Sequence, residues 1–183
     1  MYRKYQAIKP QESFLAYMRM YAPQRAEQLL ALGKTVTSTL ALSESFLTQK
    51  TDLRNHLASV PLAYANPGIT EGTVITSRGM GWLPEVNIYR WPEDMSEQAK
   101  ARSTEYWQTY ATSHRIILKA LIDAGVPIMA GTDANVPAMV PGFSLHQELQ
   151  VLQDAGMTPQ QVLQATTQTP ARWSRQRTGI IDP

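Results

Sequence analysis

Two short segments that favour β-strands place the tightest limit on how this chain can fold. The first covers residues 35–40 and is rich in β-branched side chains, and the second covers residues 126–131. Helical patterns lie before, between and after them, and strands that alternate with helices are typical of parallel βα units. Two parallel strands cannot form a sheet that is buried on both faces. The sequence therefore predicts an α/β chain that holds only part of a larger sheet.

Apolar residues recur at helical spacing in the N-terminal and central parts of the chain. One such pattern covers residues 11–33, and we expect Pro23 to divide it into two helices, because proline removes a backbone donor and clashes with the preceding turn. A long helix is expected over residues 96–124, with Ser96 as its N-cap.

The C-terminal part of the chain is predicted to contain two more helices. Ser144 can cap the first, with Leu145, Leu149 and Leu152 on its apolar face. Thr158 opens a capping box for the second helix, and a proline occupies the first helical position. From residue 172 onward the tail is polar and shows no clear element.

Residues 43–95 are predicted to form a long loop or insertion, with a short helix possible around Leu53 and Leu57. Prolines and glycines are frequent after residue 60, and a loop of this length is usually a lid, a binding loop or disordered. Its apolar and aromatic residues argue against disorder, and an irregular surface loop is the alternative. Three tryptophans could line an apolar pocket, although packing is the commoner role of such residues: Trp82 and Trp91 in this segment, and Trp107 beyond it.

Composition and charge exclude several classes of function. The formal net charge is +2, from 17 Lys and Arg residues against 15 Asp and Glu residues, and no basic cluster occurs, so we expect no nucleic-acid binding. No run of about 18 apolar residues is present, so we expect no membrane span. Cysteine is absent, which excludes disulfides, thiolate catalysis and cysteine-based zinc sites. The cellular compartment does not follow from the sequence.

Asp133 is the first candidate for chemistry. It follows the apolar strand predicted over residues 126–131. In α/β folds, ligands and metals are held at the carboxyl ends of the strands. The alternative is a local role, because aspartate often forms an Asx turn or begins a helix.

The histidines are His56, His114 and His146. A hydrolytic metal site uses about three protein ligands, mostly histidine and carboxylate, and the chain has neither an H-E-x-x-H nor an H-x-H motif. His146 lies in the helix after Asp133 and could reach back over the turn, but a histidine that donates to the backbone is the alternative. His114 is interpreted as a solvated or interface residue, and His56 lies in an ambiguous segment.

Four segments occur in an order and spacing that resemble the last barrel strand and the following helices of the metal-dependent amidohydrolases. They are AGVPIMAGTDA at 124–134, PGFSLHQEL at 141–149, AGMTP at 155–159 and TPAR at 169–172. The nearest branch is the imidazolonepropionase-like and Xaa-Pro-dipeptidase-like group, and the resemblance is strongest over residues 114–173. Residues 32–40 resemble the penultimate strand more weakly, with Ser38 where the family usually has proline.

The resemblance implies a (β/α)8 barrel that holds one or two divalent metals, with zinc expected, and activates a water to hydrolyse C–N bonds. Asp133 matches the last-strand aspartate, which is a metal ligand and accepts a proton from the attacking water. A carboxylate beside a metal-bound water of pKa about 7 suits that role. His146 is a weaker candidate, for orienting the turn that holds Asp133. Amide, cyclic amide and dipeptide substrates are all consistent with the resemblance.

Several family motifs are absent from the chain: the H-x-H of the first strand, the lysine of the fourth strand and two later histidines. Residues 1–183 are therefore expected to form a single partial barrel domain, truncated at both ends. It would hold the last two strands, the loop over residues 43–95 and the closing helices. Most metal ligands would lie outside it.

Two hypotheses remain open. In the first, the chain is the C-terminal part of an enzyme. In the second, it is a catalytically inactive remnant or accessory chain that needs a partner supplying the missing strands. Both predict that the isolated chain binds metal weakly and is inactive.

Overall fold

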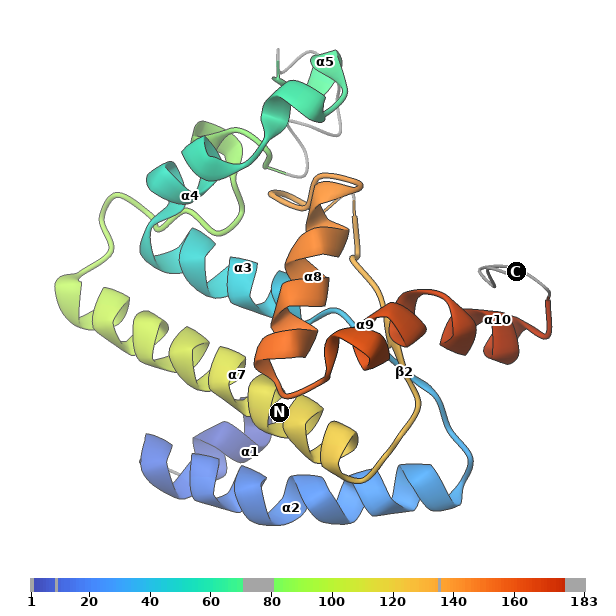
Figure 1. The fold of residues 1–183 in the computed structure, drawn as a ribbon. Helices are drawn as coiled ribbons and strands as arrows, with labels where there is room; N and C mark the ends of the chain where they lie inside the picture. The colour runs from blue at the N-terminus through green and yellow to red at the C-terminus, as the bar shows by residue number, and fades with distance from the viewer. Residues whose placement is uncertain (1, 9, 71–80, 135, 177–183) are drawn as a thin grey trace. The chain divides into compact units, whose positions relative to one another are not determined.

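The computed structural model describes residues 2–8, 10–70, 81–134 and 136–176. Helices dominate these residues, and two short strands lie among them (Figure 1). The chain divides into two compact units. The first unit consists of Met1–Leu40, Thr112–Gly131 and Glu148–Pro183, and the second consists of Ala41–Ala111 and Thr132–Gln147. None of the described helices combines the length and the apolar composition that a bilayer span requires.

The first unit contains the sheet. Strand β1 (Val36–Ser38) pairs in parallel with β2 (Ile128–Ala130), and the register joins Val36 to Ile128 and Ser38 to Ala130. Both predicted strands are confirmed, although each is shorter than expected. The prediction of an α/β chain is also confirmed. Within the described residues the sheet has no third strand and no closed barrel.

Helix α2 (Gln11–Ala31) runs without a break through Pro23, so the prediction that this proline divides it was wrong. A proline inside a helix costs about 3 kcal/mol or more. Packing compensates for this cost, because buried side chains lie on both sides of the proline: Phe14, Leu15, Met18, Ala22 and Ala26. Tertiary burial along one face therefore holds the two halves in one helix.

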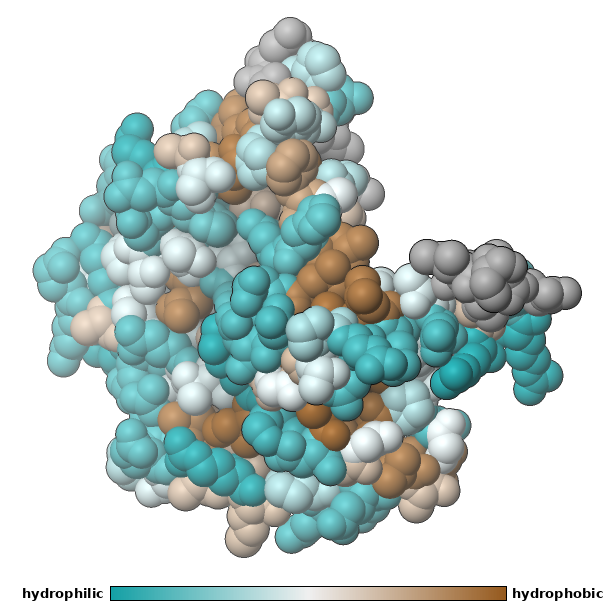
Figure 2. Space-filling model, viewed as in Figure 1, coloured by the Kyte–Doolittle hydropathy of each residue, from teal (hydrophilic) through white to brown (hydrophobic). Residues whose placement is uncertain are grey.

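Helices make up most of the rest of the first unit. They are α1 (Tyr2–Ala7), the second half of α7 (Glu97–Asp123), the end of α8 (Phe143–Asp154), α9 (Pro159–Thr166) and α10 (Gln168–Ser174). Both α9 and α10 contact β2. Hydrophilic side chains cover much of the face that Figure 2 shows. Some large hydrophobic side chains of this unit are also exposed: Met20, Leu30, Leu32, Leu163 and Trp173.

Two helices have the N-terminal caps that the sequence predicts. Ser96 caps α7, because its Oγ accepts from Ala99 N at 3.3 Å. The capping box of α9 is complete, with Gln161 N donating to Thr158 Oγ1 at 3.2 Å and Thr158 N donating to Gln161 Oε1 at 2.8 Å.

Two predictions about the C-terminal helices were wrong. Ser144 does not cap α8: the helix begins at Phe143, and Ser144 Oγ donates to the Val140 carbonyl at 2.9 Å. The tail predicted to lack structure from residue 172 is helical as far as Ser174, because α10 buries Ala171. Residues 177–183 of that tail lie outside the described residues.

The second unit begins with two helices where a long loop over residues 43–95 was predicted. They are α3 (Leu40–Thr51) and α4 (Leu53–Ser59). The short helix expected around Leu53 and Leu57 is confirmed, whereas α3 corrects the prediction. Beyond residue 60, the described part of the segment is irregular with short helical turns: η1 (Leu62–Tyr64), α5 (Pro67–Thr70) and η2 (Pro84–Val86).

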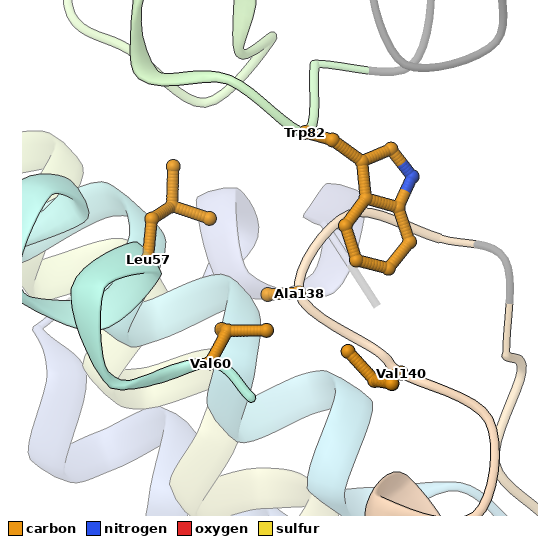
Figure 3. Packing of buried hydrophobic residues seen from close by; sticks show 5 residues of the cluster. All are labelled: Leu57, Val60, Trp82, Ala138 and Val140. Atoms are coloured by element: carbon orange, nitrogen blue, oxygen red, sulfur yellow. The ribbon is translucent and has the colours of Figure 1, made fainter. Parts of the chain in front are cut away.

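The core of the second unit is small and brings together distant segments. Trp82, which is 2% exposed, packs with Leu57 and Val60 at the end of α4 and with Ala138 and Val140 (Figure 3). Trp82 therefore has a packing role, which was the commoner alternative to lining a pocket. This contact fixes the segment after residue 81 against α4.

A buried polar network lies beside this core. Gln49 Nε2 donates to Ser45 Oγ at 3.0 Å and to the Pro137 carbonyl at 3.3 Å. Asn87 Nδ2 donates to Gln49 Oε1 at 2.9 Å and to the Gly81 carbonyl at 2.7 Å. Gln49 and Asn87 are both buried, so each bond satisfies a group that would be costly to leave unpaired.

His56 joins the network through Ser45, whose Oγ lies 3.0 Å from His56 Nε2. Because Ser45 already accepts from Gln49, its hydroxyl hydrogen is available to a neutral imidazole. Burial lowers the pKa of His56 below its usual value, and the negative charge of Asp52 opposes this shift in part. Protonated His56 would present an N–H to Ser45 and force the hydroxyl to turn away.

Gly131 comes directly after β2 and packs closely against β1. Its N–H donates to the Ser38 carbonyl at 2.7 Å. A Cβ at this position would lie 2.6 Å from Thr37 Cγ2, 3.0 Å from Thr39 Cγ2 and 3.1 Å from the Ser38 carbonyl oxygen. The close approach of the two strand ends therefore leaves no room for a side chain at residue 131.

We expect Gly131→Ala to lower the free energy of unfolding by roughly 1–3 kcal/mol, as overpacking usually does. Urea unfolding measures this loss. Thr37→Ser removes the Cγ2 methyl, so its combination with Gly131→Ala should recover part of the stability. If Gly131→Ala lowers the free energy of unfolding equally with and without Thr37→Ser, the overpacking does not involve the Thr37 methyl group.

We also expect stability to depend on pH through His56. Because its pKa is lowered in the folded state, this contribution is complete above the unfolded value of about 6.5 and is lost as the pH falls towards the folded pKa. Urea unfolding between about pH 7.5 and 5.5 checks this expectation. His56→Gln, which keeps an acceptor near Ser45, should flatten the dependence. His146→Gln is the control, and equal slopes in all three proteins would contradict the assignment.

Candidate functional site

The carboxyl end of β1 carries a buried polar pair. Ser38, the last residue of the strand, donates from Oγ to Glu148 Oε1 at 2.5 Å. Ser38 is 8% exposed and Glu148 on α8 is 0% exposed. A carboxylate withdrawn from water costs several kcal/mol unless hydrogen bonds compensate it. This bond therefore fixes the end of β1 against the second half of α8.

Glu148 was missed in the sequence, where leucines were expected to form the buried face of α8. The structure leaves Leu145 and Leu149 half-buried. Leu152 is buried, as predicted, and the other buried residues at helical spacing are Ser144, Glu148 and Val151. Two features of the sequence could have indicated that Glu148 is buried. It lies four residues before Leu152, on the same helical face, and a serine occupies position 38, where the family resemblance led us to expect proline.

Asp133 follows β2 by three residues, as its candidate role requires. Its φ of 46° is in the left-handed region, and its carbonyl accepts from Val136 N at 3.3 Å. Thr132 Oγ1 accepts from Ala134 N at 3.2 Å in the same turn. Non-glycine residues in this backbone conformation are uncommon and cluster at functional sites. The turn thus has a defined and strained geometry at the candidate residue.

The Asp133 side chain is exposed. Within the described part of the chain, no hydrogen bond or ion pair engages its carboxylate. An exposed carboxylate of this kind is free to receive a ligand, but it is not held in one orientation. Its predicted role as metal ligand and proton acceptor stays a prediction.

His146 is exposed on α8. No hydrogen bond joins it to the turn at Asp133 among the residues that the structure describes, and its orienting role also stays a prediction. His56 belongs to the buried network with Ser45, and His114 is half-buried in α7.

The described residues do not form a metal site on their own. Across residues 2–8, 10–70, 81–134 and 136–176, no group of three or more His, Cys, Asp or Glu side chains is close enough to share an ion. Structural and catalytic zinc sites use three or four protein ligands. Asp133 alone does not meet this requirement, so the expected zinc finds no complete ligand set in this part of the chain.

Of the other two predicted pocket residues, Trp107 packs within the second unit. The Trp107 ring centroid lies 5.8 Å from that of Phe46, 6.0 Å from that of Tyr89 and 5.3 Å from that of Tyr110. Lys50 Nζ lies 5.6 Å from the Tyr89 ring, and burial lowers the pKa of Lys50. Burial likewise raises the pKa of Tyr89, with a smaller contribution from Tyr110. Aromatic contacts account for these side chains without a ligand.

Comparison with known proteins gives one match. The model of the family described as "Amidohydrolase family" matches residues 42–183, which is more than half of the chain. No curated protein and no solved structure matches the chain. The matched region contains Asp133, His146 and Glu148, and it begins after β1. It identifies the family without identifying a branch. The chain therefore belongs to the amidohydrolase family.

Proposed function

We propose that this chain is the C-terminal part of a metal-dependent amidohydrolase barrel, in which residues 1–183 form one partial barrel domain. In the complete barrel, the reaction is hydrolysis of a C–N bond in an amide, a cyclic amide or a dipeptide. The imidazolonepropionase-like and Xaa-Pro-dipeptidase-like branch is our choice within the family. The family match over residues 42–183, which includes Asp133 just after a parallel strand, is the observation that carries this proposal.

The sheet supports the barrel part of the proposal. Strands β1 and β2 are parallel neighbours, and helices follow each of them along the chain. Among the described residues no further strand pairs with either outer edge. Such edges expose backbone donors and acceptors that another strand can satisfy. In our proposal, strands from outside the described residues pair with these edges.

Asp133 is the residue that we propose to act in the reaction. Hydrolysis adds the oxygen of water to the carbonyl carbon, and the C–N bond breaks with transfer of a proton to the leaving nitrogen. A carboxylate at the strand end can take the proton from the attacking water and pass it to the nitrogen. The divalent metal of the family, zinc in our proposal, needs ligands that the described residues do not supply. We therefore derive no step through it.

A second candidate function has its own support. The Asp133 carboxylate is exposed and the described residues contain no metal-ligand group, which fits an accessory chain that keeps the helices without the chemistry. Such a chain would act through a partner that completes the sheet.

We expect the purified 183-residue chain to hold far less than one zinc ion per molecule and to hydrolyse neither dipeptides nor cyclic amides. The reason is the lack of a ligand set around Asp133. Metal analysis after dialysis and an assay with both substrate classes check this. Stoichiometric zinc, or turnover that Asp133→Asn abolishes, would show that the chain holds a complete site.

A complex of this chain with the first six βα units of a family member distinguishes the hydrolase function from the accessory function. There we expect Asp133→Asn to lower kcat by about 10²–10⁴-fold, as loss of a general base does. Asp154→Asn, an exposed aspartate at the end of α8, is the matched control and should leave kcat unchanged. Near-normal turnover of Asp133→Asn would favour the accessory function.

A further inference from the structure

The stretch that begins at Asp133 holds two non-glycine residues in the left-handed region of backbone conformation. Asp133 has a φ of 46°, and Ala138 has a φ of 70°. Residues with a side chain rarely adopt this conformation, because the Cβ atom then lies too close to the following carbonyl oxygen. Such residues persist only where the surrounding structure fixes them. The second unit, which contains both residues, must therefore hold this stretch in place.

Apolar packing is one of the contacts that hold it. Ala138 is buried and packs against Trp82 (Figure 3). Backbone bonds connect this packed part to the turn, because Met139 N donates to the Val136 carbonyl at 3.0 Å and Val136 N donates to the Asp133 carbonyl at 3.3 Å. Apolar contacts have no directional preference, so they do not by themselves fix the direction of a peptide group.

Gln49 on α3 supplies a directional contact to the same stretch. Its side chain is buried, and its Nε2 donates to the carbonyl of Pro137, which is buried as well. This carbonyl belongs to the peptide group that precedes Ala138, and the orientation of that peptide group sets the φ of Ala138. The bond from Gln49 therefore acts on one of the two left-handed residues and on the neighbour of Val136, which binds the other.

Gln49 is itself held in one orientation by partners of fixed polarity. The Pro137 carbonyl can only accept, so the amino group of Gln49 faces it and Oε1 faces away. Oε1 accepts from Asn87 Nδ2 at 2.9 Å, and Asn87 Oδ1 accepts from Tyr89 N at 2.7 Å. A backbone carbonyl at one end and a backbone N–H at the other thus select a single arrangement of the two amides.

We propose that Gln49 is a positioning residue for the candidate site: its bond to the Pro137 carbonyl holds the turn that presents Asp133. This role rests on the proposed hydrolase function, in which Asp133 takes the proton from the attacking water. Gln49 acts through the backbone and not on the reacting atoms. If Gln49 only filled space, an apolar side chain of the same length would replace it without a selective effect on the turn.

Hydrogen exchange of backbone amides, measured by nuclear magnetic resonance on the full chain, tests whether Gln49 holds the turn. In Gln49→Met, which keeps the length of the side chain but removes its donors, the Val136 amide should exchange about ten-fold faster or more, the effect of losing one hydrogen bond. The Val60 amide, which donates to the Leu57 carbonyl in the same unit, reports general loss of stability and should change much less.

Ser45→Ala is the matched control for this measurement. It removes the other bond of the same nitrogen, from Gln49 Nε2 to Ser45 Oγ, and leaves the bond to Pro137. The Val136 amide should then exchange at nearly the rate of the unmodified chain. Equal acceleration of Val136 in Ser45→Ala and Gln49→Met, or of Val136 and Val60 within Gln49→Met, would indicate a general loss of stability and overturn the proposal.

The unmodified chain gives a second measurement, which needs no variant to fold. Gln49 Nε2 donates to both Ser45 and Pro137. The side-chain amide hydrogens of Gln49 should therefore exchange at least about ten-fold more slowly than those of Gln98, which is exposed. Equal rates at the two glutamines would overturn the proposal.

Turnover in the complex with the first six βα units separates the positioning role from the proposed function. Gln49→Met should lower kcat by about 10–10²-fold, as a misplaced reacting group does, and leave KM nearly unchanged. If Asp133→Asn abolishes turnover while Gln49→Met leaves kcat unchanged, the hydrolase function stands and the positioning role is overturned. If Asp133→Asn has near-normal turnover, the hydrolase function is overturned and the positioning role with it, whatever the exchange of Val136 shows.

Discussion

The hydrogen bond between Ser38 and Glu148 is the constraint on which the sheet-bearing unit depends. The two residues are 110 positions apart, and their 2.5 Å hydrogen bond joins the end of β1 to α8 where both residues are buried. The next residue after β2, Gly131, donates to the Ser38 carbonyl. The same serine therefore meets α8 through its side chain and the end of β2 through its backbone.

Local patterns were sufficient to predict the elements of this fold that local physics decides. The β-branched run before Ser38 and the apolar run before Gly131 became strands, and the capping box at Thr158 formed as its residues require. Pro23 was misjudged because a buried face on both sides of it outweighs the cost of a proline in a helix. That burial depends on the tertiary structure, which the sequence pattern alone does not report.

The candidate site was predictable in part, for the same reason. The position of Asp133 after a strand follows from the order of elements, and the structure adds its left-handed backbone and its exposure. Glu148 could not be recognised as buried from its own helix, because a charged residue there usually faces solvent. Its distant partner Ser38, which donates to the carboxylate, helps to make the burial tolerable. Family membership and the lack of a complete ligand set among the described residues are consistent with each other if other strands complete the barrel.

A double-mutant cycle between Ser38 and Glu148, measured by urea unfolding, tests the central claim most directly. Ser38→Ala, Glu148→Leu and the double variant would each be compared with the unmodified chain. If the pair fixes the strand edge, Ser38→Ala should be costly in the unmodified chain and nearly neutral beside Glu148→Leu, with a coupling free energy of about 1–3 kcal/mol. Additive effects, within about 0.5 kcal/mol, would contradict the account.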